Sequence, residues 1–163
     1  MNDKMTKALN DQINNELYAS YLYLSMSAWF ESQNWPGFAH WMRLQSQEEY
    51  DHAMKIYEFV HERGEQVTLT SIAGPKTEWK KPLDAFKDAL AHEKKVTGNF
   101  QDLTDLAIKL KDHATQIFLQ WFVTEQVEEE KNADEIIQML LKIGDSTGAM
   151  FQLDRQLGKR GAD

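Results

Sequence analysis

The 163-residue sequence contains no cysteine, only three prolines and only eight glycines. The absence of cysteine excludes disulfides, thiolate zinc sites, cysteine nucleophiles and iron–sulfur clusters, so any bound metal must use oxygen or nitrogen ligands. The scarcity of proline and glycine leaves long stretches without a helix breaker. With 42% hydrophobic and 27% charged residues, the composition is typical of a helix-rich globular protein. We expect one domain over residues 1–163.

The sequence also has few basic residues and no long apolar run. The 18 basic residues face 26 acidic ones, which gives a formal net charge of −8. This charge repels phosphate backbones and attracts cations, so nucleic acid is not an expected partner. No apolar run reaches the roughly 20 residues of a membrane span, and Met1–Met5 lacks a signal-peptide core. We therefore expect a cytoplasmic protein that does not bind membranes.

The few helix breakers divide the chain into four long segments and one short segment. Breaks are predicted at Asn34–Gly37, at Gly64 and near Asp112, while Pro82 suits the first turn of a helix. A polar tail follows from Gly158, and the basic cluster of Arg155, Lys159 and Arg160 is expected to be a solvated tail. The predicted helices cover about Thr6–Gln33, Gly37–Gly64, Pro82–Lys111, His113–Gly144 and, for the short fifth, Thr147–Leu157.

The connection over residues 65–81 decides the topology. Extended at about 3.3 Å per residue, its 17 residues reach about 56 Å, whereas a 28-residue helix is about 42 Å long. The connection can therefore return along the whole bundle and make the second and third helices parallel. The sequence predicts an all-α fold: a four-helix bundle with one long crossover between helices 2 and 3 and a short fifth C-terminal helix.

Polar residues interrupt the apolar stripe of each long helix, and the interruptions repeat at an offset of 77 residues. Each helical hairpin contributes one glutamate from its first helix and an i, i+3 pair from its second, which places the pair on one face. We expect all six side chains to meet at one level of the bundle. The matched positions are Glu16 with Glu93, Glu49 with Gln126, and His52 with Glu129.

Burial of these acids needs compensation. One glutamate on an apolar stripe is usually a snorkelling or hydrogen-bonded residue. Four buried and unpaired carboxylates, at several kcal/mol each, would offset most of the ~5–15 kcal/mol of a typical domain. No lysine or arginine lies on these stripes, so shared protons or bound cations must compensate, and we favour cations. Glutamates with one imidazole suit iron or manganese, and Glu-x-x-His beside lone glutamates is typical of di-iron bundle cores.

At these residues the chain resembles the bacterial non-haem ferritins, over nearly its whole length. The resemblance implies that Glu16, Glu49 and His52 hold one iron, and that Glu93, Glu129 and bridging Glu49 hold a second. The local sequences that carry the resemblance are Asn15–Ser20, Gln47–Ala53, His92–Glu93 and Trp121–Glu130.

The same resemblance implies roles for further residues. Gln126 would orient the second iron site, and Tyr23 would donate a hydrogen bond to Glu93. A possible third iron site would share Glu129. Its other ligands would be Glu48, Glu125 and Glu128.

The sequence also departs from related families. Bacterioferritins and rubrerythrin-like enzymes repeat Glu-x-x-His in the fourth helix, where this chain has Gln126-x-x-Glu129. Tyr50 stands where bacterioferritins carry their haem-ligating methionine, so no haem is expected. The small DNA-protecting ferritins usually place their ligands between subunits, whereas this chain carries a complete set by itself.

The resemblance implies a ferroxidase that stores iron. Fe(II) would be oxidised by O₂ or H₂O₂, and Fe(III) mineral would collect inside a homo-oligomeric shell of 24 subunits. Three aromatic residues, Trp35, Trp79 and Phe151, are candidate subunit contacts. Two alternatives stay open: a di-metal oxidase or peroxidase acting on an organic substrate or peroxide, and a metal-buffering bundle that binds Zn²⁺ or Mn²⁺ without redox chemistry.

Overall fold

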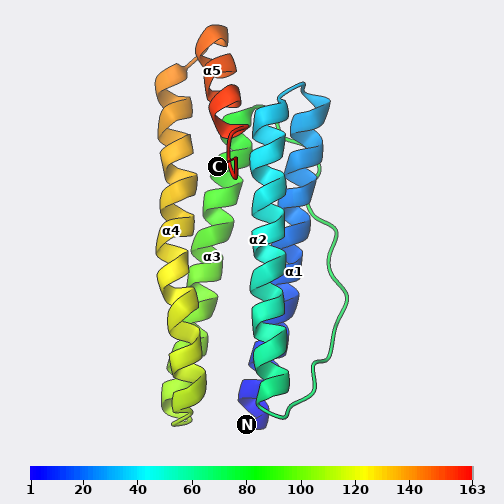
Figure 1. The fold of residues 1–163 in the computed structure, drawn as a ribbon, viewed down its shortest axis with the longest axis vertical. Coiled ribbons are helices and arrows are strands. Elements are labelled where there is room, and N and C mark those ends of the chain that lie inside the picture. Colours follow the sequence, from blue (N-terminus) through cyan, green and yellow to red (C-terminus); the bar gives the residue numbers. More distant parts are fainter. Residues whose placement is uncertain (163) are drawn as a thin grey trace.

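The computed structural model describes residues 1–162, and these form five helices and no strand. Four long helices lie side by side as a bundle, and the short α5 lies across one end (Figure 1). The predicted all-α architecture is confirmed. No helix within the described residues is long and apolar enough to cross a membrane. The helices are α1 Asp3–Ser32, α2 Pro36–Glu62, α3 Pro82–Lys109, α4 His113–Ile143 and α5 Thr147–Leu157.

Local capping explains where the helices begin and end. Helix α1 begins three residues before the predicted Thr6, because the Asn2 side chain accepts a hydrogen bond of 2.9 Å from the backbone N–H of Lys4. Ser146 caps α5 in the same way, through the backbone N–H of Ala149. Helix α3 ends two residues early, at Lys109, and Lys111 has a positive φ of 55°.

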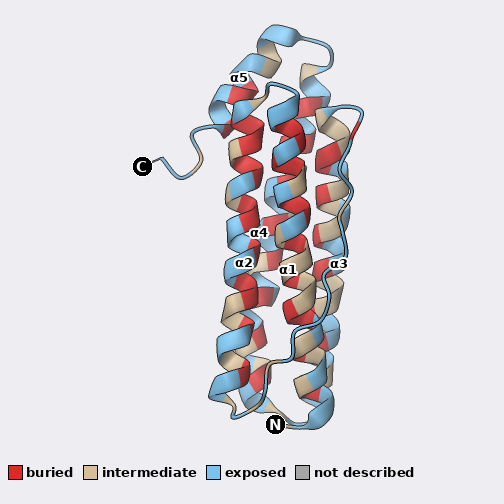
Figure 2. Cartoon of the chain, turned by 90° about the vertical axis from the view of Figure 1, so that its right-hand side faces the viewer, coloured by how far each residue is buried: buried red, intermediate tan, exposed pale blue. Residues whose placement is uncertain are grey.

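The crossover between α2 and α3 follows the outer surface of α1 (Figures 1 and 2). Three polar side chains of α1 hold it there. Asn10 accepts from the backbone N–H of Thr68 at 2.7 Å, and Asn14 donates to the carbonyl of Ser71 at 3.1 Å. Ser25 of α1 donates to the carbonyl of Lys76 in the crossover at 2.7 Å. The crossover thus returns the chain to the end at which α2 began, and α2 and α3 run parallel as predicted.

Two of the three aromatic residues proposed as subunit contacts pack within this chain. Trp79 is only 8% exposed and lies edge-on to Trp29, with 5.8 Å between ring centroids. Its indole N–H donates to Asp88 at 2.8 Å. Trp35 is partly buried against the core, while Phe151 is 60% exposed. The prediction for Trp79 was wrong because the crossover carries this residue back onto the bundle.

The apolar core is divided into two clusters, one toward each end of the bundle. The cluster at the α5 end includes Phe30, Phe38 and Phe86, and the other includes Ile13, Phe100 and Phe122. Buried residues line the inner faces of all four long helices (Figure 2). A layer of buried polar side chains separates the two clusters. In each long helix these polar residues lie between the residues of one cluster and those of the other.

Helix α5 docks on the start of α2 through a close backbone approach at Gly37. A Cβ built on Gly37 would lie 1.7 Å from the carbonyl oxygen of Asp154. The Asp154 carboxylate in turn accepts from the backbone N–H of Phe38 at 3.0 Å, and Asp154 is buried. Only glycine lets the two helices come this close.

We therefore expect Gly37→Ala to displace α5 and to lower the free energy of unfolding by about 1–3 kcal/mol or more, as overpacking does. Gly98→Ala in α3 is the matched control, because a Cβ added at Gly98 would have no neighbouring atom within 4 Å. That change should raise the free energy of unfolding by up to about 1 kcal/mol through helix propensity. Guanidinium unfolding of both variants measures the difference. Equal effects of the two substitutions would show that the contact with Asp154 does not limit stability.

Candidate metal centre

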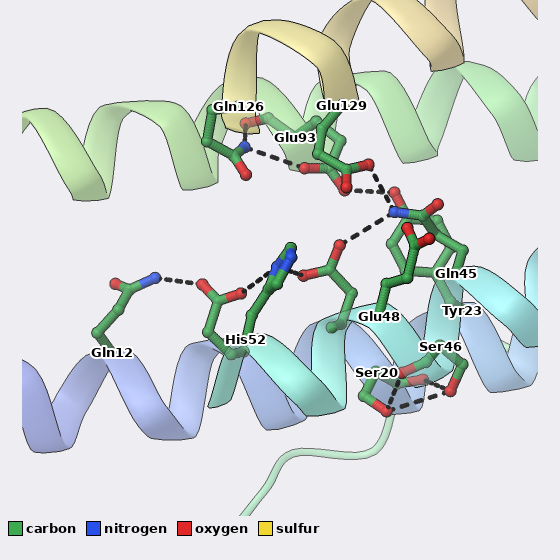
Figure 3. Close-up of polar contacts among 12 residues, drawn as sticks. Gln12, Ser20, Tyr23, Gln45, Ser46, Glu48, His52, Glu93, Gln126 and Glu129 are labelled. Atoms are coloured by element: carbon green, nitrogen blue, oxygen red, sulfur yellow. Dashed lines mark hydrogen bonds and ion pairs between the residues drawn. The ribbon is translucent and has the colours of Figure 1, made fainter. Parts of the chain in front are cut away.

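The six residues predicted to meet at one level do so in the structure. Each of the four long helices contributes at least one of them, so the two hairpins face each other across the layer (Figure 3). None has more than 5% of its surface exposed. The layer comprises Glu16 of α1, Glu49 and His52 of α2, Glu93 of α3, and Gln126 and Glu129 of α4.

One half of the layer groups Glu16, Glu49 and His52, and one ligand atom from each lies within 4.8 Å of the others. His52 Nδ1 is 3.3 Å from Glu49 Oε2 and 3.6 Å from Glu16 Oε2, within ion-pair distance. All three atoms are buried, and none has a partner in hydrogen-bond geometry among the described residues. Buried polar atoms without partners are costly, and two carboxylates facing one imidazole nitrogen form a donor set that fits a divalent cation.

The other half groups Glu49, Glu93 and Glu129, again within 4.8 Å. Glu49 belongs to both groups, so its carboxylate lies where it could bridge two cations. Tyr23 donates from its hydroxyl to Glu93 Oε1 at 2.5 Å, and Gln126 donates from Nε2 to Glu93 Oε2 at 3.1 Å. Both oxygens of Glu93 are therefore held in place by neighbouring donors.

The residues expected at a third site are not all brought together. Glu125 approaches His52 and Glu129 within 4.8 Å. Glu48 instead pairs with Arg160 at 2.8 Å, and Glu128 is exposed and outside the metal-sized groups found among the described residues. A shared third site stays a prediction.

Two glutamines that sequence reasoning did not assign to the site support it. Gln12 donates to Glu16 Oε1 at 2.5 Å. Gln45 donates to Glu49 Oε1 at 3.1 Å and to Glu129 Oε2 at 2.6 Å. Each glutamine precedes a layer glutamate by four residues, one helical turn, and this spacing was the available signal.

Arg160 was predicted to lie in a solvated tail, and that prediction was wrong. Its guanidinium donates to the Trp41 carbonyl at 3.0 Å, to Gln45 Oε1 at 2.9 Å and to Glu48 Oε2 at 2.8 Å. No helical periodicity extends into the tail, so the sequence held no signal for these contacts.

Comparison with known proteins identifies the family. A family model described as a ferritin-like domain matches residues 6–143. The chain belongs to the ferritin family. The bacterial non-heme ferritin of Staphylococcus saprophyticus is 41% identical over 163 residues, covering 100% of this chain and 98% of the relative. That of Staphylococcus haemolyticus is 42% identical over 159 residues, covering 98% and 96%.

Solved structures agree with this assignment. An open pore ferritin from the hyperthermophilic archaeon Archaeoglobus fulgidus matches with a TM-score of 0.96 and 47% identity, covering 97% of this chain and 98% of that chain. An engineered closed form of the Archaeoglobus fulgidus ferritin matches with the same TM-score and identity, covering 97% and 96%. The four-helix bundle, the crossover and α5 are thus a ferritin fold.

The buried layer of this ferritin holds protons tightly when no cation is present. Burial raises the pKa of Glu49 from its ordinary 4.5 to about 7, with a further contribution from the neighbouring Glu16. Burial and the charge of Glu49 raise the pKa values of Glu93 and Glu129 to about 8. Burial opposes a charge on His52, but the Glu16 and Glu49 carboxylates outweigh it and raise the pKa of His52 to about 11. Cations that bind here must displace protons.

These shifts predict that the metal-free ferritin loses stability as the pH rises. A carboxyl whose pKa is raised on folding stabilises the fold fully below its unfolded value of 4.5, and this contribution disappears as the pH passes 7 to 8. His52 acts in the same direction, from below 6.5 up to about 11. We expect the denaturation midpoint of chelator-treated protein to decrease as the pH is raised from 5.5 to 8.5. Added Mn²⁺ should raise the midpoint again at the higher pH.

The control replaces Glu49, Glu93 and Glu129 together with glutamine. Its denaturation midpoint should change less with pH over the same range, because the three carboxyls with raised pKa values are gone. A midpoint that rises with pH in the metal-free protein would contradict the raised pKa values.

Proposed function

We propose that this ferritin oxidises Fe(II) with dioxygen in the buried layer and stores the ferric product as a mineral inside a shell of identical subunits. The observation that carries the proposal is the position of Glu49, which is shared by two metal-sized groups of ligands. Two ferrous ions held on either side of one carboxylate can each give one electron to the same dioxygen molecule. Fixing both ions in advance removes the entropic cost of bringing them together.

The proposed ligand roles follow from which side chains lie together in the layer. Glu16, Glu49 and His52 would bind one iron, because their unpartnered atoms face one another. Glu93 and Glu129 would bind the second iron together with Glu49. The anionic oxygens favour the more highly charged Fe(III), which provides part of the driving force for oxidation.

Gln126 and Tyr23 would act as positioning residues. Both donate to Glu93 and leave it in one orientation. The Tyr23 pKa is raised well above its ordinary value by burial and by the nearby Glu93, so the hydroxyl keeps its proton and remains a donor.

Storage requires assembly, and exposed apolar side chains on a single chain are consistent with it. Tyr21 and Leu24 of α1 are 49% and 46% exposed, and Leu69 and Ile72 of the crossover are 64% and 40% exposed. The crossover lies along α1, so these side chains belong to neighbouring elements (Figure 2). Large apolar side chains gathered on a surface are typical of protein interfaces. The number of 24 subunits stays a prediction from the family resemblance, and the cytoplasmic location stays a prediction from the sequence.

The test adds excess Fe(II) to the aerobic protein and then counts the iron that co-elutes with it on size exclusion. We expect rapid oxygen consumption and far more retained iron than the ligands alone could bind. Glu49→Leu should abolish the rapid phase. It should leave the apoprotein folded with an equal or higher melting temperature, because a carboxyl group that is costly to bury is replaced by an apolar side chain.

Glu58→Leu is the control, since it makes the same chemical change on the exposed face of the same helix. Its oxidation rate should equal that of the wild type. Wild-type rates in Glu49→Leu would remove Glu49 as the bridging ligand. Oxygen consumption without iron retention would favour a di-metal oxidase, and binding of Zn²⁺ or Mn²⁺ without any oxidation of Fe(II) would favour a metal buffer.

A further inference from the structure

The C-terminal tail returns to α2 and places Arg160 beside the metal centre without making it one of the ligands. The Arg160 guanidinium lies over the Trp41 ring, 4.5 Å from its centroid, and donates to the Trp41 carbonyl at 3.0 Å. The carbonyl oxygen of Arg160 lies 2.9 Å from His40 Nε2. Only 20% of the Arg160 side chain is exposed. Because contacts hold both the guanidinium and the backbone of this residue, its positive charge has a defined position.

One buried side chain, Gln45 of α2, connects this arginine to the layer. Its amide oxygen accepts from Arg160 Nη2 at 2.9 Å. Its amide nitrogen donates to Glu49 Oε1 at 3.1 Å and to Glu129 Oε2 at 2.6 Å (Figure 3). Glu49 belongs to α2 and Glu129 to α4, so Gln45 joins carboxylates of the two facing hairpins.

Arg160 determines which way the Gln45 amide faces. A guanidinium has only donors, so it can bind only the oxygen of the amide. The amide nitrogen must then face the two carboxylates. If the arginine were absent, rotation of the amide by half a turn would place its oxygen against Glu49 and Glu129, and both carboxylates would lose a donor. A hydrogen-bonded chain that begins at a charged donor also polarises the amide and strengthens its N–H groups as donors.

The two hydrogen bonds from Gln45 select the oxygens that remain for a cation. They occupy Glu49 Oε1 and Glu129 Oε2, whereas Glu49 Oε2 has no hydrogen-bond partner among the described residues. Both carboxylates belong to the metal-sized group that contains Glu93, and only Glu49 belongs to the group that contains Glu16. Loss of the Gln45 orientation should therefore affect the ion beside Glu93 more than the ion beside Glu16.

We propose that Arg160 is a positioning residue of the metal centre, which acts through Gln45 to orient Glu49 and Glu129 for the ion beside Glu93. This inference rests on the proposed function for its ligands, because it needs a cation beside Glu93. The charge of Arg160 by itself has the opposite effect, since a positive charge near the layer repels a cation. Removal of the arginine tightens cation binding if only its charge matters, and weakens cation binding if its hydrogen bond to Gln45 matters.

The test titrates the assembled, metal-free protein with Co²⁺ by calorimetry in the absence of oxygen. We expect two ions per chain. Arg160→Met keeps an unbranched side chain on Trp41 but removes every donor. It should weaken one of the two ions by roughly tenfold, the lower end of the effect of residues that orient metal ligands. The visible absorption of the bound Co²⁺ at saturation should also change, because it depends on the coordination geometry.

Gln45→Met removes the link itself and should weaken the same ion at least as much. The double variant with Arg160→Met should bind Co²⁺ no more weakly than Gln45→Met alone, because the arginine acts through the amide. Arg160→Lys keeps a charged donor without the fork and should recover part of the affinity. Arg155→Met is the matched control: it makes the same change at an exposed position of α5 and should leave both affinities and the Co²⁺ absorption unchanged.

Equal or tighter Co²⁺ binding in Arg160→Met would overturn the proposal, because the charge alone would then account for the effect of the arginine. Additive losses in the double variant would also overturn it, since the arginine would then act by a route other than Gln45. The proposed function fails differently. A wild type that binds two Co²⁺ ions but does not oxidise Fe(II) would overturn the proposed function, and a weaker ion in Arg160→Met would still support the positioning role.

Discussion

Burial of like charge is the constraint on which this ferritin depends. Four glutamates and a histidine lie in the middle of an apolar bundle, and no lysine or arginine among the described residues lies within that layer. Burial, together with the charges of the neighbouring carboxylates, raises the carboxyl pKa values of Glu49, Glu93 and Glu129 to about 7 to 8, so the metal-free layer holds protons near neutral pH. Divalent cations offer stronger compensation than protons, and the layer is accordingly suited to exchange one for the other.

The surrounding protein keeps this layer open by binding some oxygens and leaving others free. Side-chain donors hold selected carboxylate oxygens, while Glu16 Oε2, Glu49 Oε2 and His52 Nδ1 stay without hydrogen-bond partners within the described residues. The apolar clusters toward each end of the bundle resist collapse of the helices onto these atoms, because their aromatic side chains fill the interior. The donors are Gln12, Tyr23, Gln45 and Gln126.

The two hairpins repeat the positions of the ligands but not the hydrogen-bond donors that hold the ligands. The 77-residue offset that relates the layer residues places Phe100 opposite Tyr23 and Phe122 opposite Gln45. These phenylalanines stack on each other, with ring centroids 4.6 Å apart, and belong to the core cluster away from α5. At these two positions, polar side chains that bind the layer therefore come only from the hairpin of α1 and α2. The two halves of the site differ in their hydrogen bonding as well as in their ligands.

The sequence by itself determined the helices and the layer, because both depend on local rules. Breakers fixed the helix ends to within three residues, and the repeated offset predicted which six polar side chains meet. Only the tertiary structure decided the positions of Trp79 and Arg160. The crossover carries Trp79 onto the core, and α5 brings Arg160 back to α2, 112 residues from its partner Glu48. Contacts between such distant segments follow from how the chain folds back on itself, and no periodicity along the sequence encodes them.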